Sequence, residues 1–132
     1  MKKGGILNPH INALLASIGH TDMIQIVDAG YPIPSGIPRI DITLTKNSPH
    51  FLETLRVVLR EIVVEKIILA SEMESVNYDM YKKVLGLFPD GFPVEKVPHA
   101  QFKELGNNIK GVIRTGEFSP YCNIIIVAGV AF

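Results

Sequence analysis

The sequence has little of several features that define common protein classes. Its 132 residues include a single cysteine and no tryptophan, so an internal disulfide is excluded and a reducing compartment is the easier setting. Thirteen basic residues balance thirteen acidic ones, and no block of lysine or arginine stands out. This balance removes the electrostatic footprint of a nucleic-acid-binding protein. We therefore expect no nucleic-acid partner and a cytoplasmic location.

Long hydrophobic runs are also missing. Charged residues interrupt the stretch VVLREIVVEKIILA, and asparagine, proline and histidine interrupt the N-terminal MKKGGILNPHINALLASIGH where a signal peptide would be continuously apolar. Neither stretch supplies the roughly 20 apolar residues of a membrane-spanning helix. The sequence predicts a soluble protein that is not bound to a membrane.

Several catalytic signatures are absent as well. The chain has neither of the glycine-rich loops that bind nucleotides, and it has no G-x-S-x-G nucleophile elbow. Its four histidines show no H-x-H or H-x-x-x-H spacing, and the cysteine has no partner thiol for a metal site. We expect chemistry that needs neither a metal nor another cofactor.

Apolar residues, by contrast, are abundant. They make up 47% of the chain, and the mean hydropathy of +0.25 is high for a domain of this size. A small domain cannot hide so much apolar surface by itself. The composition therefore predicts that some of this surface is buried between copies of the chain in a homo-oligomer.

The order of hydrophobic patterns predicts one α/β domain over residues 1–132, a layered sheet flanked by helices. The first helix follows the N-cap Asn8 and should end at Gly19 in the left-handed conformation. Continuous Ile/Val runs indicate strands that are covered on both faces. The expected strands are 23–30, 39–44, 65–72, 110–116 and 123–130, with an extended segment at 92–98. A second helix should open at Ser48 and Pro49 and run to about Ile62. Two further helices are expected over 75–88 and 99–105.

Four polar residues stand where such a fold could use them. His20 follows the end of the first helix, where a cationic imidazole is favoured, so it is either a helix-end residue or a proton donor. Asp28 ends an apolar strand, which suits a ligand residue or a turn cap equally. His99 opens a helix, and Lys103 lies one turn later on the same side; a solvated helix face is the alternative to a site.

The closing segment, RTGEFSPYCN (residues 114–123), supplies two further candidates. Tyr121 and Asn123 are two residues apart, so in an extended segment they share one face while Cys122 points to the other. A phenol and a carboxamide on one face offer donors and acceptors to a polyhydroxylated ligand. Cys122 is then expected to be a small core residue and not a catalytic thiol.

These motifs also carry a family resemblance. The stretches GHTD, DAGYPIP and RTGEFSPYCN, together with MKKGGILNPHI, VEKIILASE and HAQFKEL, resemble the D-ribose pyranase family, which also contains the L-fucose mutarotases. The resemblance covers nearly the whole chain. It implies an enzyme, a cofactor-independent isomerase that interconverts the β-pyranose and other ring forms of D-ribose. It also implies rings of subunits, typically decamers, with active sites built across subunit contacts.

The resemblance assigns a role to each matching residue. His20 would be the catalytic acid/base group, and the substrate-binding residues would be Asp28, His99, Tyr121 and Asn123. Lys103 would be a neighbour of the site. Two alternatives stay open: a mutarotase for another sugar such as L-fucose, and a sugar-binding accessory protein without catalytic activity.

Overall fold

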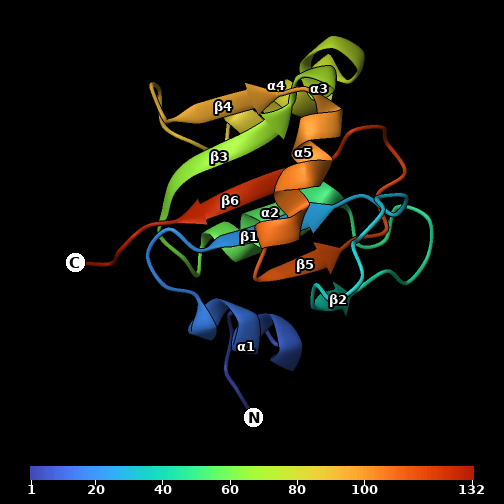
Figure 1. The fold of residues 1–132 in the computed structure, drawn as a ribbon. Coiled ribbons are helices and arrows are strands. Elements are labelled where there is room, and N and C mark those ends of the chain that lie inside the picture. Colours follow the sequence, from blue (N-terminus) through green and yellow to red (C-terminus); the bar gives the residue numbers. More distant parts are fainter.

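The computed structural model describes all 132 residues as one sheet with helices on both sides (Figure 1). The expected α/β layer fold is confirmed. The strands are β1 (Met23–Val27), β2 (Arg39–Asp41), β3 (Val64–Ala70), β4 (Val94–Val97), β5 (Gly111–Arg114) and β6 (Ile124–Ala128). The helices are α1 (Pro9–Ser17), α2 (Phe51–Leu59), α3 (Ser71–Val76), α4 (Tyr78–Leu85) and α5 (His99–Leu105), followed by the 3₁₀ turn η1 (Gly106–Asn108).

The sheet has the strand order β2-β5-β1-β6-β3-β4. The pairs β2–β5, β5–β1 and β3–β4 are parallel, whereas β6 runs antiparallel to both of its neighbours, β1 and β3. The carboxyl ends of five strands and the amino end of β6 therefore lie along one edge of the sheet, which we call the carboxyl edge. The opposite edge carries the amino ends of those five strands and the carboxyl end of β6.

Both faces of the sheet are covered, as the continuous Ile/Val runs predict. Successive residues of β6 alternate between two cores: Ile124 and Ile126 pack on one face, and Ile125 and Val127 pack on the other. Side chains from α2 and α4 complete the first core, and Phe102 of α5 belongs to the second. Figure 1 shows α5 in front of the sheet and α2 behind it.

The first helix begins as predicted but ends differently. The side chain of Asn8 accepts hydrogen bonds from the backbone N–H groups of His10 and Ile11, which confirms it as the N-cap. The prediction of a left-handed Gly19 is wrong, because the chain leaves α1 at Ile18 in an extended conformation. The positive φ, 67°, falls on Thr21, within a turn that Asp22 closes by accepting from Gly19 N at 2.9 Å.

Two other elements differ from the sequence pattern. The helix expected over 75–88 is divided at Asn77 (φ −132°, ψ 55°) into α3, which the pattern missed, and α4. The strand expected over 39–44 stops at Asp41, because the chain beyond it turns toward residues 114–116 and bonds to them through Ile42 and Thr43. No helix is long and apolar enough to cross a membrane.

The segment between β5 and β6 is fixed by backbone contacts at Gly116. Gly116 N donates to Pro49 O at 2.9 Å, and Asn47 N donates to Gly116 O. A Cβ atom at this position would lie 2.4 Å from Ser48 O and 2.5 Å from Thr45 O, both of them backbone atoms that cannot rotate away. Only glycine allows the turn at 45–49 to pack this closely against the segment.

We therefore predict that Gly116→Ala destabilises the fold, because the turn at 45–49 must move to admit the methyl group. The free energy of unfolding should fall by about 3 kcal/mol, at the upper end of the usual cost of overpacking. Chemical denaturation at a fixed protein concentration measures this change. Gly4→Ala is the matched control, since a Cβ there meets no atom within 4 Å. Equal stability of the two variants would contradict the prediction.

Candidate functional site

Four of the five candidate residues lie at the carboxyl edge. Asp28 directly follows β1, His99 follows β4 by two residues, and Tyr121 and Asn123 precede β6. The amino end of β6 reaches this edge because β6 is antiparallel to β1. The carboxyl edge is where open α/β sheets bind their ligands. The topology therefore places these residues where a site is expected.

Asp28 and Asn123 are joined by two reciprocal hydrogen bonds. Asp28 N donates to Asn123 Oδ1 at 3.0 Å, and Asn123 Nδ2 donates to Asp28 Oδ2 at 2.9 Å. Gly30 N donates to the other carboxylate oxygen at 2.9 Å. Burial raises the pKa of Asp28 above its usual value, although the bonds from Gly30 and Asn123 oppose the rise. Asn123 itself is only 1% exposed, so it fixes the orientation of the Asp28 carboxylate.

His99 sits among aromatic rings. Its ring centroid lies 5.0 Å from that of Tyr121, in a T-shaped arrangement, and it stacks on Phe102 at 6.2 Å. Glu72 Oε2 accepts from the backbone N–H of His99 at 2.9 Å and fixes the start of α5. Burial lowers the pKa of His99, with the charge of Lys103 acting in the same direction, so the ring is neutral at pH 7.

The buried Nδ1 of His99 has no hydrogen-bond partner. A hydrogen on this atom would be an unpaired buried donor, so we assign the hydrogen to Nε2. Lys103, on the next turn of α5, is exposed and affects His99 only through its charge. His99 is thus a neutral imidazole that can offer one N–H to a ligand.

Tyr121 joins this cluster in a way that the sequence pattern did not predict. The expectation of an extended segment from Tyr121 to Asn123 is wrong, because Tyr121 has a positive φ of 57° and its carbonyl accepts from Asn123 N at 2.9 Å. Side chains in such a tight turn do not alternate between two faces. The two residues still converge at the carboxyl edge, since the Tyr121 ring packs on His99 and the Asn123 amide bonds to Asp28.

Cys122 lies inside the core, as expected. Its side chain is fully buried in the cluster that includes Ile124 and Ile126, and Asn77 Nδ2 approaches its sulfur at 3.4 Å. Burial raises the pKa of the thiol to about 12, and the charges of Glu117 and Asp28 add to the effect. The reactive thiolate is therefore almost absent at neutral pH.

His20 is the candidate that the structure does not bring to the cluster. It precedes β1, whereas Asp28 follows it, so the five residues of this strand separate the two by about 16 Å. At the opposite edge, His20 Nε2 lies 2.8 Å from Glu65 Oε2 beside β3, with both side chains well exposed. A hollow of about 290 Å³ next to it is lined mostly by apolar residues, including Val63, Val130 and Phe132.

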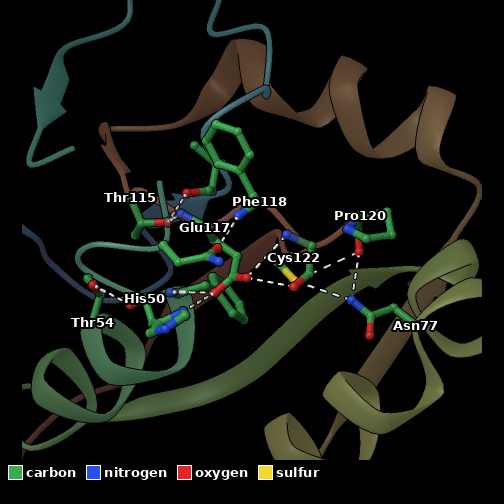
Figure 2. Close-up of polar contacts among 12 residues, drawn as sticks. His50, Thr54, Asn77, Thr115, Glu117, Phe118, Pro120 and Cys122 are labelled. Carbon is green, nitrogen blue, oxygen red and sulfur yellow. Dashed lines mark hydrogen bonds and ion pairs between the residues drawn. The ribbon is translucent and has the colours of Figure 1, made fainter. Parts of the chain in front are cut away.

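Glu117 is a residue that the sequence reasoning did not select. Its carboxylate is buried against the start of α2, where it accepts from Phe51 N and Ser119 Oγ. The ring of His50 lies beside it (Figure 2). Burial alone would raise the pKa of Glu117, but hydrogen bonds from Ser119, His50 and the backbone of Phe51 together hold it below its usual value. The signal available in the sequence was that Glu117 is the only acidic residue after Glu104 and stands in the polar stretch before the last strand.

A cavity of about 480 Å³ lies beside Asp28 but does not include His99 or Tyr121. Polar side chains of the 43–46 turn and of the closing segment line it together with Arg114. Arg114 is already engaged, since its guanidinium donates to Ala29 O and to Asp41 Oδ2. No group of three or more His, Cys, Asp or Glu side chains is arranged to hold a metal ion.

The burial of Cys122 leads to a prediction about its reactivity. Iodoacetamide at pH 7.5 should alkylate the native protein at a rate at least about 100-fold below that of a free thiol, because both the high pKa and the burial oppose attack. Mass spectrometry measures the rate, and the same protein unfolded in guanidinium chloride is the control. Fast alkylation that D-ribose prevents would instead show that Cys122 faces the ligand.

Known proteins resemble this chain over its whole length. Residues 1–131 match the model of the RbsD / FucU transport protein family. The chain is 50% identical to a D-ribose pyranase of Geobacillus thermodenitrificans, over 100% of this chain and 99% of that protein, and 47% identical to one of Petrotoga mobilis over the full length of both. The structure of Bacillus subtilis RbsD complexed with D-ribose superposes with a TM-score of 0.95, at 46% identity and full coverage of both chains. The chain therefore belongs to the RbsD / FucU family.

Proposed function

We propose that the protein is a D-ribose pyranase, an enzyme that opens and recloses the ring of D-ribose by acid/base catalysis without a cofactor. The observation that carries this proposal is the cluster at the carboxyl edge, in which a half-buried carboxylate fixed by Asn123 lies beside a neutral His99. Full-length similarity to proteins named D-ribose pyranase supports the choice of sugar, and so does the likeness to a structure that holds D-ribose.

The reaction needs proton transfers and no redox chemistry. Ring opening removes the proton of the anomeric hydroxyl and adds one to the ring oxygen as the bond between carbon and oxygen breaks. The free aldehyde can rotate before the ring closes again in another form. Because sugars open spontaneously, acid/base assistance of about 10²- to 10⁴-fold is sufficient.

Each residue of the cluster has a role suited to its environment. Asp28 and His99 present an acceptor and an N–H donor, and Tyr121 presents a phenol beside them. Asn123 holds Asp28 in place and retains one amide hydrogen for the ligand. These contacts orient the hydroxyl groups of the sugar, which lowers the barrier by positioning.

His20 is the proposed acid/base group, and it must reach the site from another copy of the chain. Within one chain the length of β1 separates it from Asp28. His20 also lies beside apolar side chains that are exposed in the single chain, Val63, Val130 and the terminal Phe132. We propose that this surface packs on the carboxyl edge of a neighbouring subunit in a ring, decameric by family resemblance, and that the contact brings His20 to the sugar.

Two other functions remain distinguishable by experiment. A mutarotase for L-fucose would use the same cluster with a different preferred sugar, and an accessory binding protein would need the cluster but not His20. Saturation-transfer NMR measures the exchange between the ring forms of each sugar directly. Acceleration with D-ribose well above that with L-fucose is the result expected here.

We predict that His20→Ala lowers the exchange rate of D-ribose by about 10²-fold or more, because it removes the proton-transfer group. Saturation-transfer NMR measures the rate, and size-exclusion chromatography confirms that the assembly is intact. His10→Ala is the matched control, since His10 is exposed on α1. Exchange at the wild-type rate in an assembled His20→Ala protein would remove this residue from the mechanism.

A second prediction concerns the assembly. Light scattering at micromolar concentration should give a mass well above that of a dimer of 14.6 kDa chains, because the surface around His20 needs an apolar partner. Val63→Glu places a charge in that surface and should weaken the assembly, whereas Glu53→Gln on the exposed side of α2 should not. A stable wild-type monomer would contradict the shared site.

A further inference from the structure

Glu117 accepts hydrogen bonds through both of its carboxylate oxygens. Oε1 accepts from Ser119 N at 3.1 Å and from Ser119 Oγ at 2.6 Å. Oε2 accepts from Phe51 N at 3.2 Å and lies 3.1 Å from His50 Nδ1. The side chain is only 3% exposed. A carboxylate that accepts hydrogen bonds on both oxygens is held in one position and orientation.

The contact with Phe51 links Glu117 to helix α2. Phe51 is the first residue of α2, and the N-cap residue His50 makes no side-chain capping bond. The Glu117 carboxylate therefore takes the place of an N-cap side chain from 66 residues away in the sequence. Its negative charge also suits the positive pole of the helix. Figure 2 shows the ring of His50, at this helix start, beside the Glu117 carboxylate.

Residues on either side of Glu117 connect it to the cluster of Asp28, His99, Tyr121 and Asn123 at the carboxyl edge. Before it, Thr115 Oγ1 donates to Val27 O at 2.8 Å, and the carbonyl of Glu117 accepts from Ala29 N at 2.9 Å, so the segment is bonded on both sides of Asp28. After it come Ser119 and Pro120, and then Tyr121 in its positive-φ conformation. The position of Glu117 thus fixes the segment that carries Tyr121 and Asn123.

A second contact holds the far end of this segment. Asn77, at the junction of α3 and α4, donates through Nδ2 to Pro120 O at 2.9 Å. The segment is therefore attached to α2 through Glu117 and to the α3–α4 junction through Asn77, with Tyr121 directly after the second attachment. Loss of the first attachment removes one of the two contacts that position the segment on the approach to Tyr121.

We propose that Glu117 is a positioning residue for the sugar site, because its buried carboxylate ties the segment bearing Tyr121 and Asn123 to α2 and to the end of β1 that carries Asp28. This inference rests on the proposed function. Glu117 acts through Tyr121 and Asn123, since its own two oxygens are engaged by Ser119 and by the start of α2.

The geometry requires a carboxylate and excludes its amide. Each oxygen accepts from a backbone N–H group, Ser119 N on one side and Phe51 N on the other. In Glu117→Gln, either orientation of the amide turns its NH₂ group toward one of these donors, so one contact becomes repulsive. The substitution keeps the size of the side chain and removes one attachment, which makes it a sharp test.

Saturation-transfer NMR over a range of D-ribose concentrations tests the inference by separating KM from kcat. For Glu117→Gln we expect KM to rise about tenfold, since a misplaced Tyr121 weakens binding. We expect kcat to change by less than about threefold, because His20 and its environment are untouched. Glu53→Gln, the same change at an exposed position in the first turn of α2, should leave both constants unchanged. A purely structural role would lower the amount of active protein, and with it kcat, at constant KM.

Ser119→Ala is the second variant. It removes only the 2.6 Å bond from Ser119 Oγ and should raise KM about threefold, so it decides the question if Glu117→Gln does not fold. If Glu117→Gln folds, a KM within twofold of wild type would overturn the inference. If Glu117→Gln does not fold, the same result for Ser119→Ala would overturn it. Either result leaves the proposed function standing. A wild-type protein that does not accelerate exchange would overturn both.

Discussion

The arrangement of the site depends on one reversed strand. β6 lies between β1 and β3 and runs against both, so its first residues meet the carboxyl end of β1 and its last residues meet the amino end. The reciprocal hydrogen bonds between Asp28 and Asn123 are the direct result. The same reversal carries the terminal residues after Ala128 to the edge where His20 lies. One strand thus joins Asp28 and Asn123 at one edge of the sheet and carries an apolar surface to the other.

Two acids at the carboxyl edge, the half-buried Asp28 and the buried Glu117, differ in what governs their pKa. Asp28 is held by Asn123 and Gly30, but burial prevails and raises its pKa, which suits a group that exchanges hydrogen bonds with a ligand. Glu117 has donors on both oxygens, and these hydrogen bonds prevail over burial and lower its pKa, which suits a group that stays ionised and fixed. The number and direction of donors thus shift the pKa values of the two carboxylates in opposite directions.

Much of this could be predicted from the sequence, because the signals are local. The cap at Asn8, the helix from His99 to Leu105 and the buried Ile/Val strands depend on neighbouring residues and are found where expected. The left-handed Tyr121 was not predicted, since the contacts that hold its segment, from Phe51 to Glu117 and from Asn77 to Pro120, join residues far apart in the sequence. The separation of His20 from Asp28, by contrast, follows from the predicted strand alone, since the two residues stand at its opposite ends.

The central claim is that His20 and the sugar cluster of one site belong to different copies of the chain. Complementation tests it: His20→Ala and Asp28→Asn subunits, each inactive alone, are unfolded together, refolded as mixed assemblies and assayed by saturation-transfer NMR with D-ribose. If neighbouring subunits share each site, random mixing restores both intact partners in roughly a quarter of the sites, and exchange should return to about that fraction of the wild-type rate. Mixed assemblies that are no more active than the separate variants would show that each site is built from a single chain.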